Sequence, residues 1–141
     1  MNIETKTKRK LLLSYFIVCT LLFIVLQIGA SDQARRIAPI FYAFFCPIFF
    51  FGIRINLVFK ISSYVETKYP DLMKKNLIGS NGFRGETINL FGINRKEFLA
   101  KNDNLMDDMI ETHLLLIKLV LVSFFTLIVV SIFGLNFGTV L

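Results

Sequence analysis

Three long apolar stretches constrain this chain more than any other feature of its sequence. They cover residues 11–30, 37–59 and 114–133, and each has about 20 mostly apolar residues, the length an α-helix needs to cross a bilayer. The 141-residue chain is 55% hydrophobic and only 18% charged, whereas a soluble domain has about 25% charged residues. We therefore predict an all-α integral membrane protein with three transmembrane helices.

The second and third of these helices are expected to continue beyond the membrane. Apolar residues keep a helical period after residue 59 until Pro70 ends it, so the second helix should extend to about residue 69. Asn104 is expected to be the N-cap of a third helix over 104–133, with acidic residues in its first turn. The chain is then one membrane domain over 1–141.

Residues 70–103 connect these two helices and are predicted to form a small helical cap. Pro70 favours the start of a helix that Gly79 ends. Turns are expected over 81–85, and a pattern that resembles a capping box predicts a second short helix over 95–101. A segment this short buries little by itself, so it should be stabilised by docking on the membrane helices.

The cations predict a cytoplasmic N-terminus. Lys and Arg are retained on the cytoplasmic side of membrane helices. Four cations precede the first span and others flank the long connection, whereas the turn after the first span has only two and the C-terminal tail has none. The cations on the cytoplasmic side would be Lys6, Lys8, Arg9, Lys10, Arg54, Lys60, Lys68 and Lys118, and those of the turn are Arg35 and Arg36.

The first apolar stretch also resembles a secretory signal. Its apolar run is longer than the usual central region of about 7 to 15 residues, so we interpret it as a retained signal anchor. We expect a multi-pass protein of a bacterial inner membrane, with the C-terminus outside.

Two cations inside the spans are candidate binding residues. Arg54 lies near the cytoplasmic end of the second span, and Lys118 lies near the start of the third. Both are close enough to an end to extend to the headgroups, which is the structural interpretation. If both point inward at the same depth, they predict a site for an anionic lipid headgroup.

The second span is rich in aromatic residues around Pro47. Proline removes a helical hydrogen bond, so Pro47 is expected to bend this helix. We interpret the bend as an adjustment of packing, and the alternative is a gating role. Phe45 and Phe49 belong to a cluster that surrounds the helix and is expected to contact lipid and partner helices alike. Phe45, Pro47 and Phe49 are therefore candidate contact residues for another membrane protein.

The sequence argues against catalysis. The lone imidazole, His113, is expected at the membrane boundary as a surface residue, far from Ser123 on the same helix. Cys19 and Cys46 lie deeper and are interpreted as small buried hydrophobes. We expect no catalytic residues, no cofactor and no metal.

Four acidic residues near the start of the third helix lack the spacing of a calcium loop. They are interpreted as a solvated helix face: Asp103, Asp107, Asp108 and Glu111. From Lys60 to His113 the chain has eight cations and eight anions, a balance that argues against nucleic-acid binding.

Two resemblances bear on function. Tyr69-Pro70-Asp71-Leu72, Leu90-Phe91, Glu97-Phe98-Leu99 and Asn102-Asp103-Asn104-Leu105 are similar to a pattern in small bacterial inner-membrane proteins related to universal stress protein B. That resemblance implies a non-enzymatic membrane protein with no active-site residues. Phe45-Cys46-Pro47 resembles an element in some immunity proteins against pore-forming bacteriocins, which contact toxin helices in the bilayer.

The predicted function is that of a non-enzymatic accessory protein that binds another membrane protein. The alternative is an immunity protein that protects the inner membrane against a pore-forming bacteriocin or toxin. Membrane lipids, including anionic ones, are the other expected partners.

Overall fold

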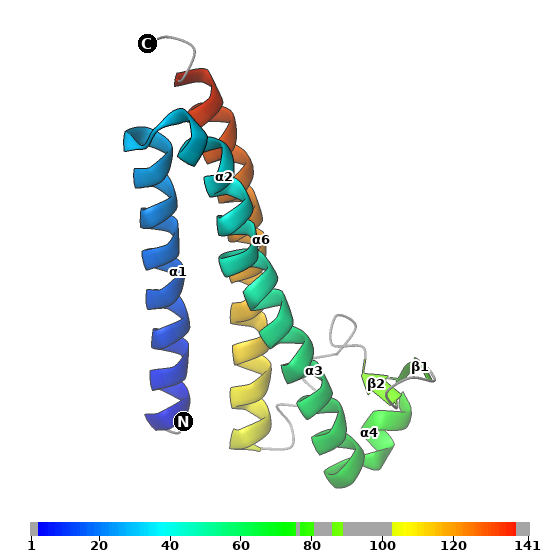
Figure 1. Ribbon diagram of the computed structural model, residues 1–141. Coiled ribbons are helices and arrows are strands. Elements are labelled where there is room, and N and C mark those ends of the chain that lie inside the picture. The colour runs from blue at the N-terminus through cyan, green and yellow to red at the C-terminus, as the bar shows by residue number, and fades with distance from the viewer. Residues whose placement is uncertain (1–2, 76, 81–85, 89–102, 138–141) are drawn as a thin grey trace.

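The structure, a computed structural model, describes residues 3–75, 77–80, 86–88 and 103–137. Figure 1 shows three long rods side by side. The N-terminus lies at the end of the bundle that carries the connection between the second and third rods. In chain order the elements are α1 (Ile3–Gly29), α2 (Asp32–Ala43), the π-helix η1 (Phe44–Ile48), α3 (Phe49–Lys68), α4 (Pro70–Lys75), β1 (Leu77–Ser80), β2 (Glu86–Ile88) and α6 (Asn104–Phe137).

Three helices are long and apolar enough to cross a membrane, namely Lys6–Gly29, Asp32–Lys68 and Asn104–Phe133. The predicted all-α class with three such helices is thereby confirmed. The second helix joins α2, η1 and α3 without a break, and its 37 residues span roughly 55 Å, more than a hydrocarbon core of about 30 Å. It ends at Lys68 because Tyr69 precedes a proline and leaves the helical conformation, with φ −138° and ψ 61°.

The connection differs from the predicted helical cap. Its first helix ends at Lys75 rather than near Gly79, and Leu77–Ser80 is a strand instead. This strand pairs antiparallel with β2, with Leu77 opposite Ile88 and an irregularity before Ser80. The pairing with β2 gives the backbone of this segment the hydrogen bonds that a continued helix would have provided. The turns predicted over 81–85 and the helix predicted over 95–101 lie outside the described residues.

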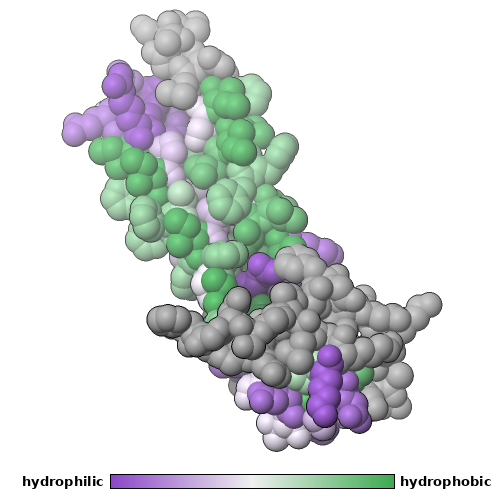
Figure 2. Space-filling model, turned by 90° about the vertical axis from the view of Figure 1, so that its right-hand side faces the viewer, coloured by the Kyte–Doolittle hydropathy of each residue, from purple (hydrophilic) through white to green (hydrophobic). Residues whose placement is uncertain are grey.

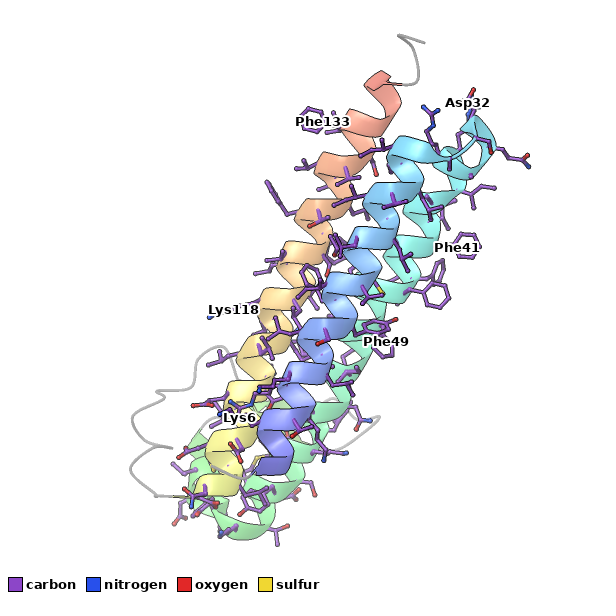
Figure 3. The ribbon with its side chains drawn as sticks, turned by 90° about the vertical axis from the view of Figure 1, so that its left-hand side faces the viewer. Lys6, Asp32, Phe41, Phe49, Lys118 and Phe133 are labelled. Carbon is purple, nitrogen blue, oxygen red and sulfur yellow. The ribbon has the colours of Figure 1, made fainter. Side chains whose placement is uncertain are left out.

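Apolar side chains cover the outside of the long helices. Figure 2 shows a hydrophobic belt along the bundle with hydrophilic residues towards both ends. In Figure 3, Lys6 lies near one end and Asp32 and Phe133 lie near the other. Leu11 is 70% exposed and Phe125 is 69% exposed, which is the arrangement expected when hydrocarbon replaces water as the solvent.

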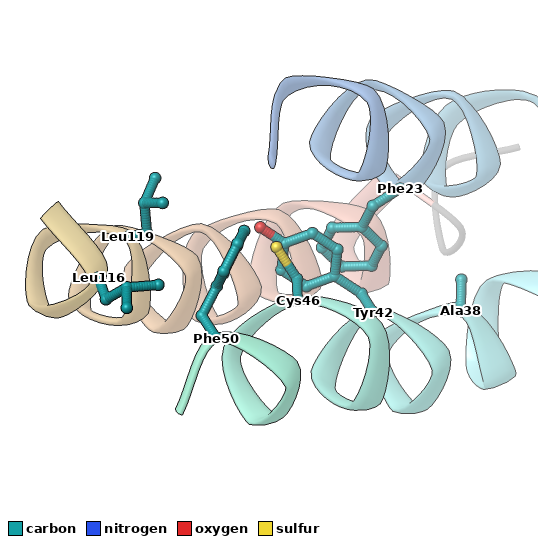
Figure 4. Close-up of a cluster of buried hydrophobic side chains, with 7 residues drawn as sticks. All are labelled: Phe23, Ala38, Tyr42, Cys46, Phe50, Leu116 and Leu119. Atoms are coloured by element: carbon teal, nitrogen blue, oxygen red, sulfur yellow. The ribbon is translucent and has the colours of Figure 1, made fainter. Parts of the chain in front are cut away.

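The core is small because the helices meet along narrow seams. Both α1 and α3 pack on α6. Figure 4 shows the main cluster, in which Tyr42, Cys46 and Phe50 extend from the second helix. The Phe23 and Tyr42 rings stack with centroids 4.4 Å apart. A second cluster joins the outer part of α3 to α4 and α6 through Ile61, Val65, Met73 and Met106.

Candidate functional site

The π-helix η1 contains Pro47, which is buried. Proline has no N–H to donate and clashes with a regular helix, so the chain accommodates it by a local change of hydrogen-bond register. The carbonyl of Phe45 in this segment accepts a hydrogen bond from the Tyr15 hydroxyl of α1, at 2.8 Å. A backbone group of the irregular turn is thus satisfied by a neighbouring helix, as hydrocarbon requires.

Three exposed rings form a row beside η1, which we call the aromatic ladder: Phe41, Phe45 and Phe49. Phe41 and Phe45 stack with centroids 6.3 Å apart and an interplanar angle of 6°. The Phe49 ring contacts the Tyr15 ring, with centroids 5.0 Å apart. Figure 3 shows Phe41 and Phe49 on the side of the second helix away from α6. Two of the predicted contact residues, Phe45 and Phe49, are therefore exposed, whereas the third, Pro47, is buried.

A groove of about 230 Å³ lies between α1 and α2 beside this ladder. Its walls are almost entirely apolar, and two rings of the ladder, Phe41 and Phe45, line it. The other lining residues are Tyr15, Cys19, Leu22, Phe23, Leu26, Ala38 and Tyr42.

Arg54 and Lys118 have different surroundings. Arg54 interacts electrostatically with His113 on the inward face of α6. Lys118 is exposed, and in Figure 3 it projects outward from α6. Positions 113 and 118 are about 140° apart around a helix. Arg54, which acts on His113, and Lys118 therefore lie on different sides of α6. The headgroup site predicted from this pair stays a prediction.

The prediction that His113 is a surface residue is wrong, because its side chain is only 1% exposed. It follows Met106 by seven residues, which is close to two helical turns, and Met106 faces the second core cluster. The side chain of His113 is thereby directed into the bundle. Ser123 lies ten residues, or about 15 Å, further along α6, where its hydroxyl is 3.4 Å from the Cys46 thiol.

The two thiols lie near one another in the fold. Cys46 is fully buried in the main cluster, Cys19 packs against that cluster, and both are free. The interpretation as small buried hydrophobes is therefore confirmed for Cys46, whereas Cys19 is half-buried and lines the groove between α1 and α2. Among the described residues, no group of three or more His, Cys, Asp and Glu side chains is arranged to hold a metal.

An ion pair between α1 and α6 was missed by the sequence analysis. Arg9 Nη2 lies 2.8 Å from Asp108 Oδ1, and Arg9 Nη1 also bonds to Glu111. Asp108 is only 7% exposed, so the prediction of a solvated acidic face is wrong for this residue. Asp108 and Glu111 are three residues apart and therefore share one helix face. This spacing is the one signal in the sequence that could have identified them as partners of a cationic side chain.

Asp103 is the second acidic residue that is not solvated. Its carboxylate accepts hydrogen bonds from Lys68 Nζ at 2.8 Å, Tyr64 at 2.8 Å and Tyr69 at 2.9 Å. These bonds, that of Lys68 above all, hold the pKa of Asp103 well below its usual range. Burial beside this carboxylate raises the pKa of Tyr69.

Asp103 also caps α6. Its Oδ1 accepts from the backbone N–H groups of Leu105 at 3.2 Å and Met106 at 3.4 Å. The helix begins at Asn104, so the N-cap is Asp103 and not Asn104 as predicted. Asp and Asn both cap helices well. Asp103 is the cap here because its carboxylate is held by Tyr64, Lys68 and Tyr69 at the end of α3. Asp103 thereby joins the end of the second helix to the start of the third.

A cleft of about 600 Å³ opens between α1 and α3 on the side of Arg9 and Asp108. In Figure 1, α1 and α3 diverge towards the end of the bundle that carries the N-terminus. We call this cavity the α1–α3 cleft. Its lining residues are Lys8, Leu11 and Leu12 of α1, Ile53, Asn56, Leu57 and Lys60 of α3, and Leu105, Asp108, Met109 and Thr112 of α6.

These features define a multi-pass α-helical membrane protein. No protein-family model, curated protein or solved structure matches the chain. The resemblances to universal stress protein B and to bacteriocin immunity proteins therefore stay predictions.

Proposed function

We propose that this chain is a non-enzymatic accessory protein that binds another integral membrane protein through the aromatic ladder. The observation that carries the proposal is the fixed arrangement of the exposed rings. Phe45 stacks on Phe41, its own carbonyl accepts a hydrogen bond from Tyr15, and the Tyr15 ring also contacts Phe49. Rings that are already ordered lose little conformational entropy on binding, and aromatic side chains dominate the binding energy of many interfaces.

The groove beside the aromatic ladder favours a protein, and not fluid lipid, as the partner. Lipid tails are as apolar as the helices themselves, so helices associate in a bilayer through close packing and interhelical hydrogen bonds. A concave groove of about 230 Å³ next to projecting rings offers such packing to a partner helix. Irregular π-helical turns like η1 also occur frequently at functional sites.

A binding role fits the chemistry of the described residues better than a catalytic role. The Ser123 hydroxyl donates to the Leu119 carbonyl at 2.5 Å and lies beside the Cys46 thiol. Both candidate nucleophiles are buried in the middle of the bundle, about 15 Å along α6 from the His113 imidazole. A base at that separation does not activate either nucleophile.

The proposed location is a bacterial inner membrane, with the N-terminus and the α4 connection in the cytoplasm. The end of the bundle with the N-terminus carries Lys6, Lys8, Arg9 and Lys10, and cations favour the cytoplasmic side. Alkaline phosphatase and green fluorescent protein fused to the C-terminus test this orientation. Active phosphatase and a dark fluorescent protein are expected, and the opposite pattern would refute it.

Photocrosslinking in intact membranes tests the protein partner. A photoreactive phenylalanine analogue replaces Phe45 in the full chain, and a matched variant carries it at Phe125 on α6, which is also exposed. We expect position 45 to give one discrete crosslinked membrane protein and position 125 to give lipid adducts. The crosslink should disappear in a Phe41→Ala, Phe49→Ala background and persist in a Phe124→Ala background.

Three outcomes would contradict the proposal. They are lipid adducts alone at position 45, an equal protein adduct at position 125, and a crosslink only to a second copy of this chain. A crosslink that forms only when a pore-forming toxin is added would instead assign the ladder to the immunity function.

A further inference from the structure

One face of α1 lines two cavities of the bundle. The residues of α1 in the α1–α3 cleft and in the groove between α1 and α2 recur every three or four positions, which is the spacing of one side of a helix. They are Lys8, Leu12, Tyr15, Cys19, Leu22 and Leu26. The cleft and the groove therefore lie on the same side of α1, one after the other along the bundle.

The second helix forms the other wall of both cavities in the same way. Its lining residues recur at this spacing on either side of Phe49, whose ring contacts the Tyr15 ring where the groove passes into the cleft. They are Ala38, Phe41 and Phe45 in the groove, and Ile53, Asn56 and Lys60 in the cleft. We call the groove and the α1–α3 cleft together the membrane trough.

The membrane trough is about as long as a bilayer is thick. Its wall on the second helix extends from Ala38 to Lys60, which is roughly 33 Å, and its wall on α1 extends from Lys8 to Leu26, which is roughly 27 Å. A hydrocarbon core is about 30 Å thick, and a lipid acyl chain covers only one of its two leaflets. A single transmembrane helix is the occupant whose length matches the whole trough.

Gly52 gives the membrane trough a point of close approach. It follows Phe49 by three residues and precedes Asn56 by four, so it lies on the same face of α3 as these two residues. A Cβ atom at Gly52 would meet no atom within 4 Å, so no contact inside this chain requires a glycine there. Glycine weakens a helix relative to alanine, but small residues let a second membrane helix come close. The position therefore fits a helix from another protein.

We propose that the membrane trough binds one transmembrane helix of the partner protein, with the backbone of that helix closest to α3 at Gly52. The inference rests on the proposed function and extends it, because the contact continues from the aromatic ladder along α1 into the α1–α3 cleft. Apolar side chains of the partner helix fill the two cavities, and such packing is what favours helix association in a bilayer. At the end of the trough near the N-terminus, Asn56 offers its amide to a polar side chain of the partner.

Matched positions on α1 test the occupant of the membrane trough. Leu11 lines the cleft and Leu22 lines the groove, whereas Leu13 and Leu21 line neither of these cavities, and all four are exposed. The photoreactive phenylalanine analogue is placed at one of these positions at a time, in the full chain in intact membranes. We expect positions 11 and 22 to capture the same protein as position 45, and positions 13 and 21 to give lipid adducts.

The outcomes separate this inference from the proposed function. Lipid adducts alone at positions 11 and 22, together with a protein adduct at position 45, would refute the helix in the trough and leave the aromatic ladder as the binding surface. Absence of a protein adduct at position 45 as well would refute both proposals. Equal protein adducts at all four positions of α1, or adducts only to a second copy of this chain, would also overturn the inference.

A filling variant tests the close approach at Gly52. Gly52→Leu places a side chain where this chain has no atoms, so the melting temperature in detergent should be unchanged. The yield of the crosslinks at positions 11 and 22 should fall about tenfold, because the added side chain overpacks the contact with the partner. Gly29→Leu is the control, since a Cβ atom there also meets nothing within 4 Å and Gly29 does not line the trough. Unchanged crosslinks in the Gly52→Leu protein would refute the proposed helix.

Discussion

Arg9 of α1 donates a hydrogen bond to the Asp108 carboxylate of α6, with 2.8 Å between Nη2 and Oδ1, although the two residues are 99 positions apart in the chain. This bond joins α1 to α6 at the end of the bundle where α1 and α3 diverge. It therefore holds one wall of the α1–α3 cleft in place. The neighbouring Lys8 lines the same cleft.

Arg9→Ala should destabilise the fold by about 2 kcal/mol, because Asp108 is almost buried and would lose its charged partner. The measurement is thermal unfolding in detergent, followed by a thiol-reactive dye that reports exposure of the buried Cys46 in a Cys19→Ala background. Lys10→Ala, which removes an exposed cation one residue away, should leave the midpoint unchanged. Equal shifts in both variants would show that net charge, and not this ion pair, matters.

Stability should fall in acid through Asp103. Its pKa is lowered in the folded state, chiefly by the hydrogen bond from Lys68. Its contribution to stability is therefore complete above the unfolded pKa of about 3.9 and is lost as the pH falls towards the lower folded value. The melting temperature should decline below about pH 4.

Asp103→Asn should flatten this decline, since asparagine still caps a helix but cannot titrate. The protein is melted in the same detergent at a series of pH values. Asp71→Asn, at an exposed position in the first turn of α4, serves as the control and should keep the wild-type profile. An unchanged acid decline in Asp103→Asn would assign the titration to other carboxylates.

Tyr15→Phe should destabilise the protein by about 1 kcal/mol, because the Phe45 carbonyl would lose its donor inside the membrane. The ring remains, so packing against Phe49 is kept. Thermal unfolding gives the stability, and the yield of the photocrosslink at position 45 reports the aromatic ladder and should fall as well. An unchanged crosslink with normal stability would show that the hydroxyl does not order the ladder.

Two adjacent phenylalanines should differ sharply. Phe50 is fully buried in the main cluster, whereas Phe51 is 46% exposed. Phe50→Ala leaves a cavity between the helices and should cost about 3 kcal/mol. Phe51→Ala exchanges one lipid-facing group for another and should cost little, as measured by the same thermal unfolding. A similar loss of stability at both positions would show that the packing of the main cluster does not distinguish Phe50 from Phe51.

Hydropathy predicted the three long helices, because a membrane-crossing segment is recognised from the average over about 20 consecutive residues. Proline also predicted the end of the second helix correctly, since Tyr69 leaves the helical conformation before Pro70. The strand at Leu77–Ser80 was not predicted, because its pairing with Glu86–Ile88 is a contact with a segment several residues away. Among the candidate site residues, exposure of Phe45 and Phe49 agreed with their predicted role as contact residues, but the role itself stays a prediction.

The sequence by itself determined that this chain forms three helices long and apolar enough to cross a membrane, because the length and apolar content of a segment are properties of that segment alone. Only the tertiary structure decided which side chains of those helices meet. Lipid and protein neighbours are equally apolar, so hydrophobic periodicity does not separate the lipid-facing side of a helix from its packed side. The pairing of Arg9 with Asp108, the burial of His113 and the α1–α3 cleft therefore become visible only when the helices are assembled.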